Sequence, residues 1–151
     1  MIRKTLATNN GAGTTMLRLV LGVIFFAHGA QLMLGWFGGY GLHGSMRFLT
    51  SGLHIPSALA FLGIATEFFG GIALIVGFLT RIAAIGIAID MLVAILMVHE
   101  QFGFFMNWFG AQKGEGYEYH LLAIAIALFL FFEGGGAASI DRLLTPASQT
   151  E

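Results

Sequence analysis

Four long apolar stretches dominate the sequence and restrict what the chain can fold into. They cover residues 16–35, 57–79, 82–99 and 119–137. A transmembrane helix needs about 20 predominantly apolar residues, with a range of about 17–25. The apolar residues run continuously instead of alternating, which argues against strands, and backbone groups in lipid must be bonded within their own segment. The sequence therefore predicts an all-α membrane protein, a four-transmembrane-helix bundle that forms one domain over residues 1–151.

The composition supports a membrane location and removes several classes of function. Hydrophobic residues make up 57% of the chain and charged residues only 10%, against about 25% charged residues in a typical soluble domain. The net charge is −1, so no basic surface is available to release counterions from a nucleic acid, and a nucleic-acid partner is not expected. The absence of cysteine excludes disulfides and thiolate chemistry, but not redox chemistry carried by a bound cofactor.

The segments outside the apolar stretches complete the predicted topology. Thr80-Arg81 is a tight turn, so the second and third helices form an antiparallel hairpin. The first external loop is expected to hold a short interfacial helix over residues 45–51, capped by Ser45. Polar tails are expected at residues 1–13 and 145–151.

Lysine and arginine residues predict the orientation of the bundle, because they accumulate on the cytoplasmic side. If both chain ends face the cytoplasm, that side holds Arg3, Lys4, Arg18, Arg81 and Arg142, and the opposite side holds Arg47 and Lys113. This asymmetry favours a cytoplasmic N-terminus and a cytoplasmic C-terminus.

Ionisable side chains inside the apolar stretches are the first candidates for a functional site. Each costs about 2.5–3.5 kcal/mol or more at membrane depth unless it is paired. They are His28, Glu67 and Asp90, with Arg18, His99, Glu118 and His120 nearer the helix ends. At a rise of about 1.5 Å per residue, His28 lies about 17 Å and Glu67 about 18 Å from the cytoplasmic ends, whereas Asp90 lies about 12 Å from them.

These depths predict one polar cavity that opens outward. His28 and Glu67 are level, and Gln31 shares the helix face of His28. The outer group that completes the cavity lies near the outer boundary and consists of His99, Glu118 and His120. Asp90 is expected to pair with Arg18 or Arg81, or to be protonated, and the two arginines are most simply side chains that extend toward the cytoplasmic interface. On a straight helix Asp90 and His99 point to opposite faces.

The sequence resembles the DoxX family of small bacterial membrane proteins in four places. These are residues 18–39 (RLVLGVIFFAHGAQLMLGWFGG), residues 67–84 (EFFGGIALIVGFLTRIAA), His99 with Gly103-Phe104-Phe105, and residues 116–119 (GYEY). Family members often carry a lysine where Leu32 stands here. If that lysine contributes to an anionic substrate or headgroup site in the family, that contact is missing in this chain. The resemblance implies a multi-pass protein of the bacterial inner (plasma) membrane.

The leading hypothesis for function is a quinone-linked redox component. The resemblance implies it, because some family relatives are subunits of a thiosulfate:quinone oxidoreductase and others are associated with thiol-redox systems. In this hypothesis His28 and Glu67 are catalytic, as hydrogen-bond donor and proton carrier. The residues that would bind the cofactor are His28, Gln31, Glu67, Glu118 and His120. A soluble redox partner would have to supply the electrons.

Two other classes of function remain open at this point. One is a binding or transport protein for a small solute or lipid, which with four spans would be expected to work as a homo-oligomer. The other is a non-catalytic scaffold subunit of a membrane complex. A metal site of His99, His120 and Glu118 is a weaker idea without a ligand-spacing motif, so no metal site is assigned.

Overall fold

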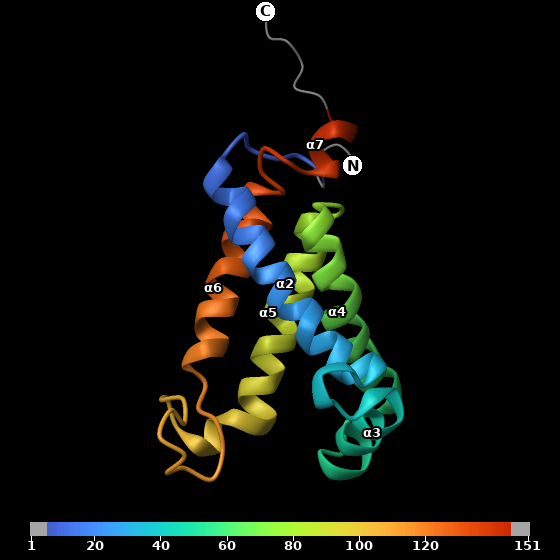
Figure 1. The fold of residues 1–151 in the computed structure, drawn as a ribbon, viewed down its shortest axis with the longest axis vertical. Coiled ribbons are helices and arrows are strands. Elements are labelled where there is room, and N and C mark those ends of the chain that lie inside the picture. The colour runs from blue at the N-terminus through green and yellow to red at the C-terminus, as the bar shows by residue number, and fades with distance from the viewer. Residues whose placement is uncertain (1–5, 146–151) are drawn as a thin grey trace, which may run out of the picture.

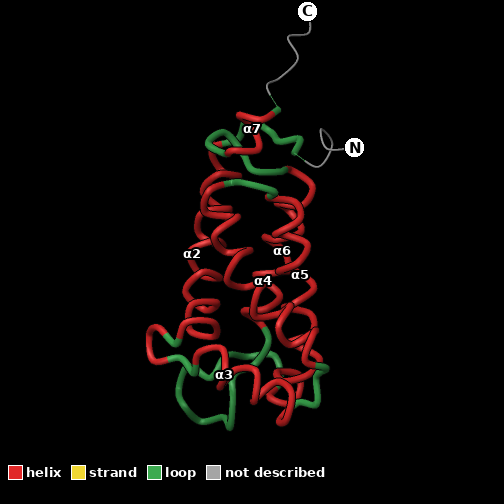
Figure 2. Tube along the Cα trace, turned by 90° about the vertical axis from the view of Figure 1, so that its right-hand side faces the viewer, coloured by secondary structure: helices red, strands yellow, loops and turns green. Residues whose placement is uncertain are grey.

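The computed structural model describes residues 6–145, and every regular element in that range is helical. The long helices are α2 (Ala12–Leu34), α4 (Ser57–Val76), α5 (Thr80–Ala94) and α6 (Glu118–Glu133). Figure 1 shows that they form a bundle in which α2 crosses α4, while α5 lies between α4 and α6. Figure 2, turned by 90°, shows the helices running along the long axis with loops at both ends. The predicted all-α membrane bundle is confirmed.

Three helical stretches are long and apolar enough to cross a bilayer. They are Ala12–Leu34, Ser57–Val76 and Thr80–Phe102, the last of which continues α5 through a π-helical segment (Ile95–His99) and a 3₁₀ turn (Glu100–Phe102). Helix α6 has 16 residues, about 24 Å of helix, and packs along α5. It ends at Glu133 instead of reaching residue 137, because Gly134 adopts a left-handed φ of 84° and turns the chain.

The two ends of the bundle differ in what they hold. One, the terminal end, holds residues 6–11 and the short helix α7 (Ile140–Leu144); the other, the loop end, holds α3 (Gly41–Arg47) and the connection of residues 103–117 (Figure 1). Exposed aromatic side chains occur in the segments at the loop end, where membrane-interface residues are expected. They are Trp36, Phe37, Tyr40, Phe104, Phe105, Trp108 and Phe109.

The predicted N-cap of the loop-end helix is wrong. Helix α3 begins at Gly41 and is prolonged by a π-helical segment (Phe48–Gly52), so Ser45 lies inside it, with a buried hydroxyl that has no hydrogen-bond partner among the described residues. The helix starts early because Gly35, Gly38 and Gly41 all have positive φ and reverse the chain directly after α2.

Glycines allow α2 and α4 to cross at backbone contact. A Cβ atom on Gly29 would lie 2.4 Å from the backbone nitrogen of Phe68, and one on Gly71 would lie 2.3 Å from that of Phe26. In lipid, where apolar burial contributes little to helix association, such close packing of small residues holds helices together. This crossing sets His28, next to Gly29, level with Glu67.

Polar bonds close the terminal end. Asp141 of α7 is 1% exposed, and its carboxylate accepts the backbone N–H groups of Leu79 at 2.8 Å and Thr80 at 2.9 Å, which caps the start of α5. Asn9 donates to Glu133 at 2.7 Å, so the described part of the segment expected to be a tail packs against the bundle from residue 6 onward. Residues 1–5 and 146–151 of the expected tails lie outside the described range.

Arg18 does not extend to the interface. Its side chain is 1% exposed and donates to the carbonyl oxygens of Gly135 at 2.8 Å, Ile75 at 2.8 Å and Ala138 at 2.5 Å, and also to that of Leu74. Arg81 is bound in the same way, to the carbonyl oxygens of Ala7 and Phe131. The guanidinium groups of both arginines therefore bond to backbone carbonyls at the terminal end. The expected pairing of Asp90 with one of them is not formed.

Candidate functional site

Two carboxyl groups meet in the middle of the bundle. Glu67 of α4 and Asp90 of α5 are at the same depth on neighbouring helices and line the same groove. Two neighbouring carboxyl groups away from water repel each other when both are charged, so this acid pair, as we call it, favours a form in which one of them carries a proton. Gly63, one turn before Glu67, makes room for the pair, since a Cβ there would lie 3.0 Å from Oδ1 of Asp90.

The acid pair forms part of the wall of a large groove. The groove has a volume of about 680 Å³ and lies along α4 and α5, with the chain from Phe48 to Pro56 at its loop end. Besides Glu67 and Asp90, its polar side chains are Thr66 and His54, and all others are apolar. The groove is therefore an apolar site of the size that binds small molecules, with a few polar groups at one place.

A second group of polar side chains lies at the loop end, between α2, α5 and α6. The rings of His99 and His120 are 4.0 Å apart, and Tyr119 lies 5.6 Å from His120 and 6.5 Å from His28 between ring centroids. Glu67 lies beside this group at the α2–α4 crossing, since a Cβ atom on Gly29, next to His28, would be 2.7 Å from its backbone carbonyl carbon. We call His28, His99, Tyr119 and His120 the histidine cluster.

The π-helical segment explains how His99 reaches this cluster. Nine residues separate it from Asp90, which on an α-helix is a rotation of about 180°. A π turn holds one residue more than an α turn, so the angle around the helix axis between Asp90 and His99 falls to about 80°. The continuous helix therefore presents Asp90 to α4 and His99 to α6. The expectation of opposite faces holds only for a straight helix.

The structure separates the residues that were expected to form one cavity. Glu67 lines the groove, whereas His28 is exposed on α2 and His120, at 7% exposure, is buried in the histidine cluster. Gln31 donates to the carbonyl oxygen of Phe37 at 3.4 Å, within the turn that follows α2.

Glu118 also lies apart from the groove. Its Oε1 accepts the backbone N–H of Met106 at 2.8 Å and the indole N–H of Trp108 at 3.3 Å, so it orders the 103–117 connection. Its carboxylate is therefore not free to join His99 and His120, and among the described residues no group of three histidine or acidic side chains is placed to hold a metal ion.

Asp90 and Tyr119 are the residues that sequence reasoning left out of the site. Asp90 was placed a turn too near the terminal end because both helices were assigned the wrong ends there. In the structure Glu67 is about 14 Å before the end of α4 and Asp90 about 15 Å after the start of α5, so they are level. Tyr119 carried no signal, since a tyrosine at the start of a span reads as an interface residue.

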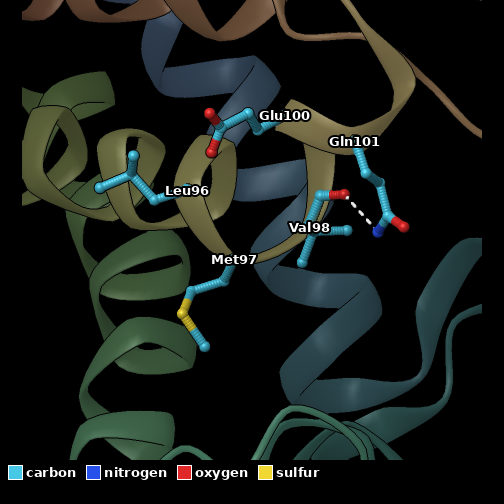
Figure 3. Close-up of a pocket in the computed structure, with 5 residues that line it drawn as sticks. All are labelled: Leu96, Met97, Val98, Glu100 and Gln101. Carbon is cyan, nitrogen blue, oxygen red and sulfur yellow. Dashed lines mark hydrogen bonds between the residues drawn. The ribbon is translucent and has the colours of Figure 1, made fainter.

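A smaller hollow lies on the outer side of α5, beside the π-helical segment. Figure 3 shows its lining, Leu96, Met97, Val98, Glu100 and Gln101, with the Gln101 amide donating to the Val98 carbonyl at 3.0 Å. That bond satisfies a carbonyl at the transition from the π to the 3₁₀ turn. Glu100 and Gln101 are exposed, so the hollow lacks the buried polar groups of a site.

Comparisons with known proteins agree with this architecture. The family model described as DoxX matches residues 13–100, which include α2, α4, α5 and the acid pair. The chain is 31% identical to "Putative oxidoreductase CatD" of Bacillus subtilis (strain 168) over 118 residues, 78% of each chain. It is 30% identical to "Inner membrane protein YqjF" of Escherichia coli (strain K12) over 132 residues, 87% of this chain and 92% of the relative. No solved structure matches the chain. With a family model over more than half of its length and two relatives that span most of it, this membrane protein belongs to the DoxX family.

Proposed function

We propose that this DoxX-family protein binds an isoprenoid quinone, or a similar lipid-soluble carrier, in the groove along α4 and α5. The observation that carries the proposal is the acid pair in the wall of an otherwise apolar groove. Buried carboxyl groups at membrane depth are costly and are typical of proton-handling sites.

The groove suits a molecule that travels in the bilayer. Several side chains that line it are also exposed on the outer surface of the helices, among them Leu59, Leu62 and Ile89. On a membrane-spanning helix such a surface faces lipid, so a carrier can enter sideways from the bilayer without crossing water. The apolar walls would pack its ring and the first part of its chain.

The acid pair supplies the chemistry that a quinone requires. Conversion of a quinone to a quinol takes up two electrons and two protons. Glu67 and Asp90, sharing a proton, would donate it to a carbonyl oxygen of the ring and be reprotonated afterwards. The electrons would come from a soluble reductant protein, and the name of the Bacillus relative, a putative oxidoreductase, agrees with a redox role.

A pair of tryptophan substitutions tests this assignment. Ile89 and Leu92 are both exposed on α5, at 57% and 51%, but only Ile89 lines the groove. We expect Ile89→Trp to fill the groove and lower quinone occupancy at least about tenfold, and Leu92→Trp to leave it unchanged, since filling a ligand pocket removes affinity of order 1.4 kcal/mol or more. The measurement is native mass spectrometry with lipid and quinone extraction on detergent-purified protein.

Other outcomes of this experiment reassign the groove. A phospholipid in place of a quinone, lost in Ile89→Trp alone, would favour lipid binding or transport. A folded wild type that carries no small molecule, even after incubation with decylubiquinone, would contradict the proposal and favour a scaffold role.

We further propose that the terminal end faces the cytoplasm of a bacterial cell, with the loop end outside. The distribution of lysine and arginine supports this orientation. Because the chain has no cysteine, single introduced cysteines report accessibility without background. In intact cells a membrane-impermeant maleimide should label Lys113→Cys, in the loop-end connection, and should label the exposed Leu143→Cys of α7 only after lysis. The reverse pattern would invert the topology.

A further inference from the structure

The acid pair lies in the membrane interior, so any proton that it gives up must be replaced from water at one end of the bundle. Between the acid pair and the terminal end, the residues of α4 and α5 are apolar, apart from Thr80 and Arg81 at the end itself. Leu74, Ala84 and Ile87 are fully buried there. Between the pair and the terminal end, the described residues of α4 and α5 therefore include no acidic or histidine side chain.

Toward the loop end, titratable side chains continue from the pair without a long gap. Glu67 lies at the α2–α4 crossing, where a Cβ atom on Gly29 would be 2.7 Å from its backbone carbonyl carbon. His28, next to Gly29, is 6.5 Å from Tyr119, and Tyr119 is 5.6 Å from His120, between ring centroids. The ring of His120 is 4.0 Å from that of His99, whose Nδ1 lies 2.8 Å from the carbonyl oxygen of Glu115. Rings with centroids this close bring their polar atoms within reach of bridging waters.

The ring of His120 supports a role beyond packing. The residue is 7% exposed, and its buried Nδ1 has no hydrogen-bond partner among the described residues. Leaving a buried polar atom unpaired is costly, so such an atom marks a place where a water molecule is bound or a proton is transferred. A neutral imidazole carries a proton on one nitrogen and accepts one on the other, which lets it take up a proton on one side and release another on the opposite side.

We propose that Tyr119, His120 and His99 form a proton path from Glu67 to the water at the loop end. The path rests on the proposed role of the acid pair as a proton carrier. In this path the function of the histidine cluster is to supply protons to Glu67. A proton enters at His99 from the surface, His120 and Tyr119 each accept one and pass one on, and Glu67 receives it.

Hydrogen–deuterium exchange of the protonated carboxyl group tests the path without any ligand. In lipid-reconstituted protein, the infrared C=O band of the acid pair is identified by its loss in Glu67→Gln and in Asp90→Asn, and its shift is followed after transfer to D₂O. We expect exchange to slow about 100-fold in Tyr119→Phe and in His99→Ala, the lower part of the range that one positioned proton carrier contributes.

Each variant has a matched control. Tyr117→Phe makes the same change two residues earlier, on a ring that packs against Phe104 at 5.7 Å, and His43→Ala removes an exposed histidine of α3. Neither control should alter the exchange rate. Tyr119→Phe keeps the ring and therefore the packing of α6, and size-exclusion chromatography with circular dichroism verifies that each variant is folded.

Two results would overturn the path. One is exchange in Tyr119→Phe and His99→Ala as fast as in their controls, which would mean that protons reach the pair through the groove. The other is a protonated carboxyl band that survives both Glu67→Gln and Asp90→Asn. Failure of quinone binding in the mass-spectrometry experiment, with exchange still slowed by Tyr119→Phe, would reject the carrier and leave the path standing.

Discussion

Arg18→Met is expected to lower the free energy of unfolding by about 3–5 kcal/mol, the largest effect of any single substitution considered for this protein. Methionine fits the apolar stem of arginine but has no donor. The change therefore leaves the carbonyl oxygens of Leu74, Ile75, Gly135 and Ala138 without the guanidinium that they share. These oxygens are at a site where Arg18 is 1% exposed, so water does not replace the lost bonds.

The position of the carbonyls makes the effect larger than the loss of one residue suggests. Leu74 and Ile75 are in the last turn of α4, where the helix dipole is negative and carbonyl oxygens lack the usual helical partner, although that of Leu74 also accepts the N–H of Gly77 at 3.2 Å. Gly135 and Ala138 are in the turn that connects α6 to α7. Arg18 on α2 thus joins three parts of the chain, and Arg18→Lys, which keeps the charge but not the planar fork, should recover only part of the stability.

Unfolding by SDS titration, followed by far-ultraviolet circular dichroism, measures this effect. Arg142→Met is the matched control at the same end, because Arg142 is only partly buried and bonds to Asn10 and Ala137 near the surface. We expect that control to lower stability by about 1 kcal/mol or less, as for exposed pairs. Equal losses in the two variants would show that the buried guanidinium group of Arg18 contributes no more to the free energy of unfolding than the partly exposed one of Arg142.

The example of Arg18 shows where prediction from the sequence stops. The continuous apolar stretches predicted the helices, because length and composition are local properties. The partners of Arg18 come from segments 56 to 120 residues away, and no local pattern tells an arginine that reaches the interface from one that turns inward. The same holds for Asp141, which caps α5 from 61 and 62 residues further along the chain.

The candidate site was predicted in part for a similar reason. Glu67 stood out because a carboxyl group inside an apolar stretch is costly wherever its side chain points. Its partner was misplaced, since depth was counted from helix ends that were wrong by two or three residues, and each residue adds about 1.5 Å. The turn of α5 that brings His99 to His120 depends on one π-helical segment, and neither composition nor periodicity predicts where such a segment forms.

The double substitution Glu67→Gln and Asp90→Asn is expected to act in the opposite direction from Arg18→Met. It should raise the free energy of unfolding by about 1–4 kcal/mol, as replacement of buried ionisable groups by neutral residues of similar size often does. Gln and Asn side chains both donate and accept, so the two amides can bond to each other without a shared proton. The wild-type pair holds titratable groups inside the membrane, and the guanidinium groups of Arg18 and Arg81 bond to backbone carbonyls elsewhere.

The same double variant should fail in the proposed chemistry. Amides do not release protons, so the exchangeable carboxyl band disappears. Bound quinone, measured by extraction from purified protein, should fall by about tenfold if one hydrogen bond from a protonated carboxyl group to the ring is lost, an effect of order 1.4 kcal/mol. A gain in stability together with a loss of function is typical of residues that are kept for activity and not for folding.

Asp141→Asn provides the contrast that decides between a functional and a structural role for the acid pair. It makes the same chemical change, carboxylate to amide, but at a group whose two oxygens accept the N–H groups of Leu79 and Thr80. Because an amide keeps only one acceptor oxygen, this variant should lose about 1–2 kcal/mol, the range for an impaired helix cap. SDS titration of both variants shows whether the free energy of unfolding rises in the double variant and falls in Asp141→Asn. If the double variant is destabilised like Asp141→Asn, the acid pair holds α4 against α5, and the proposal that it serves as a proton carrier loses its physical basis.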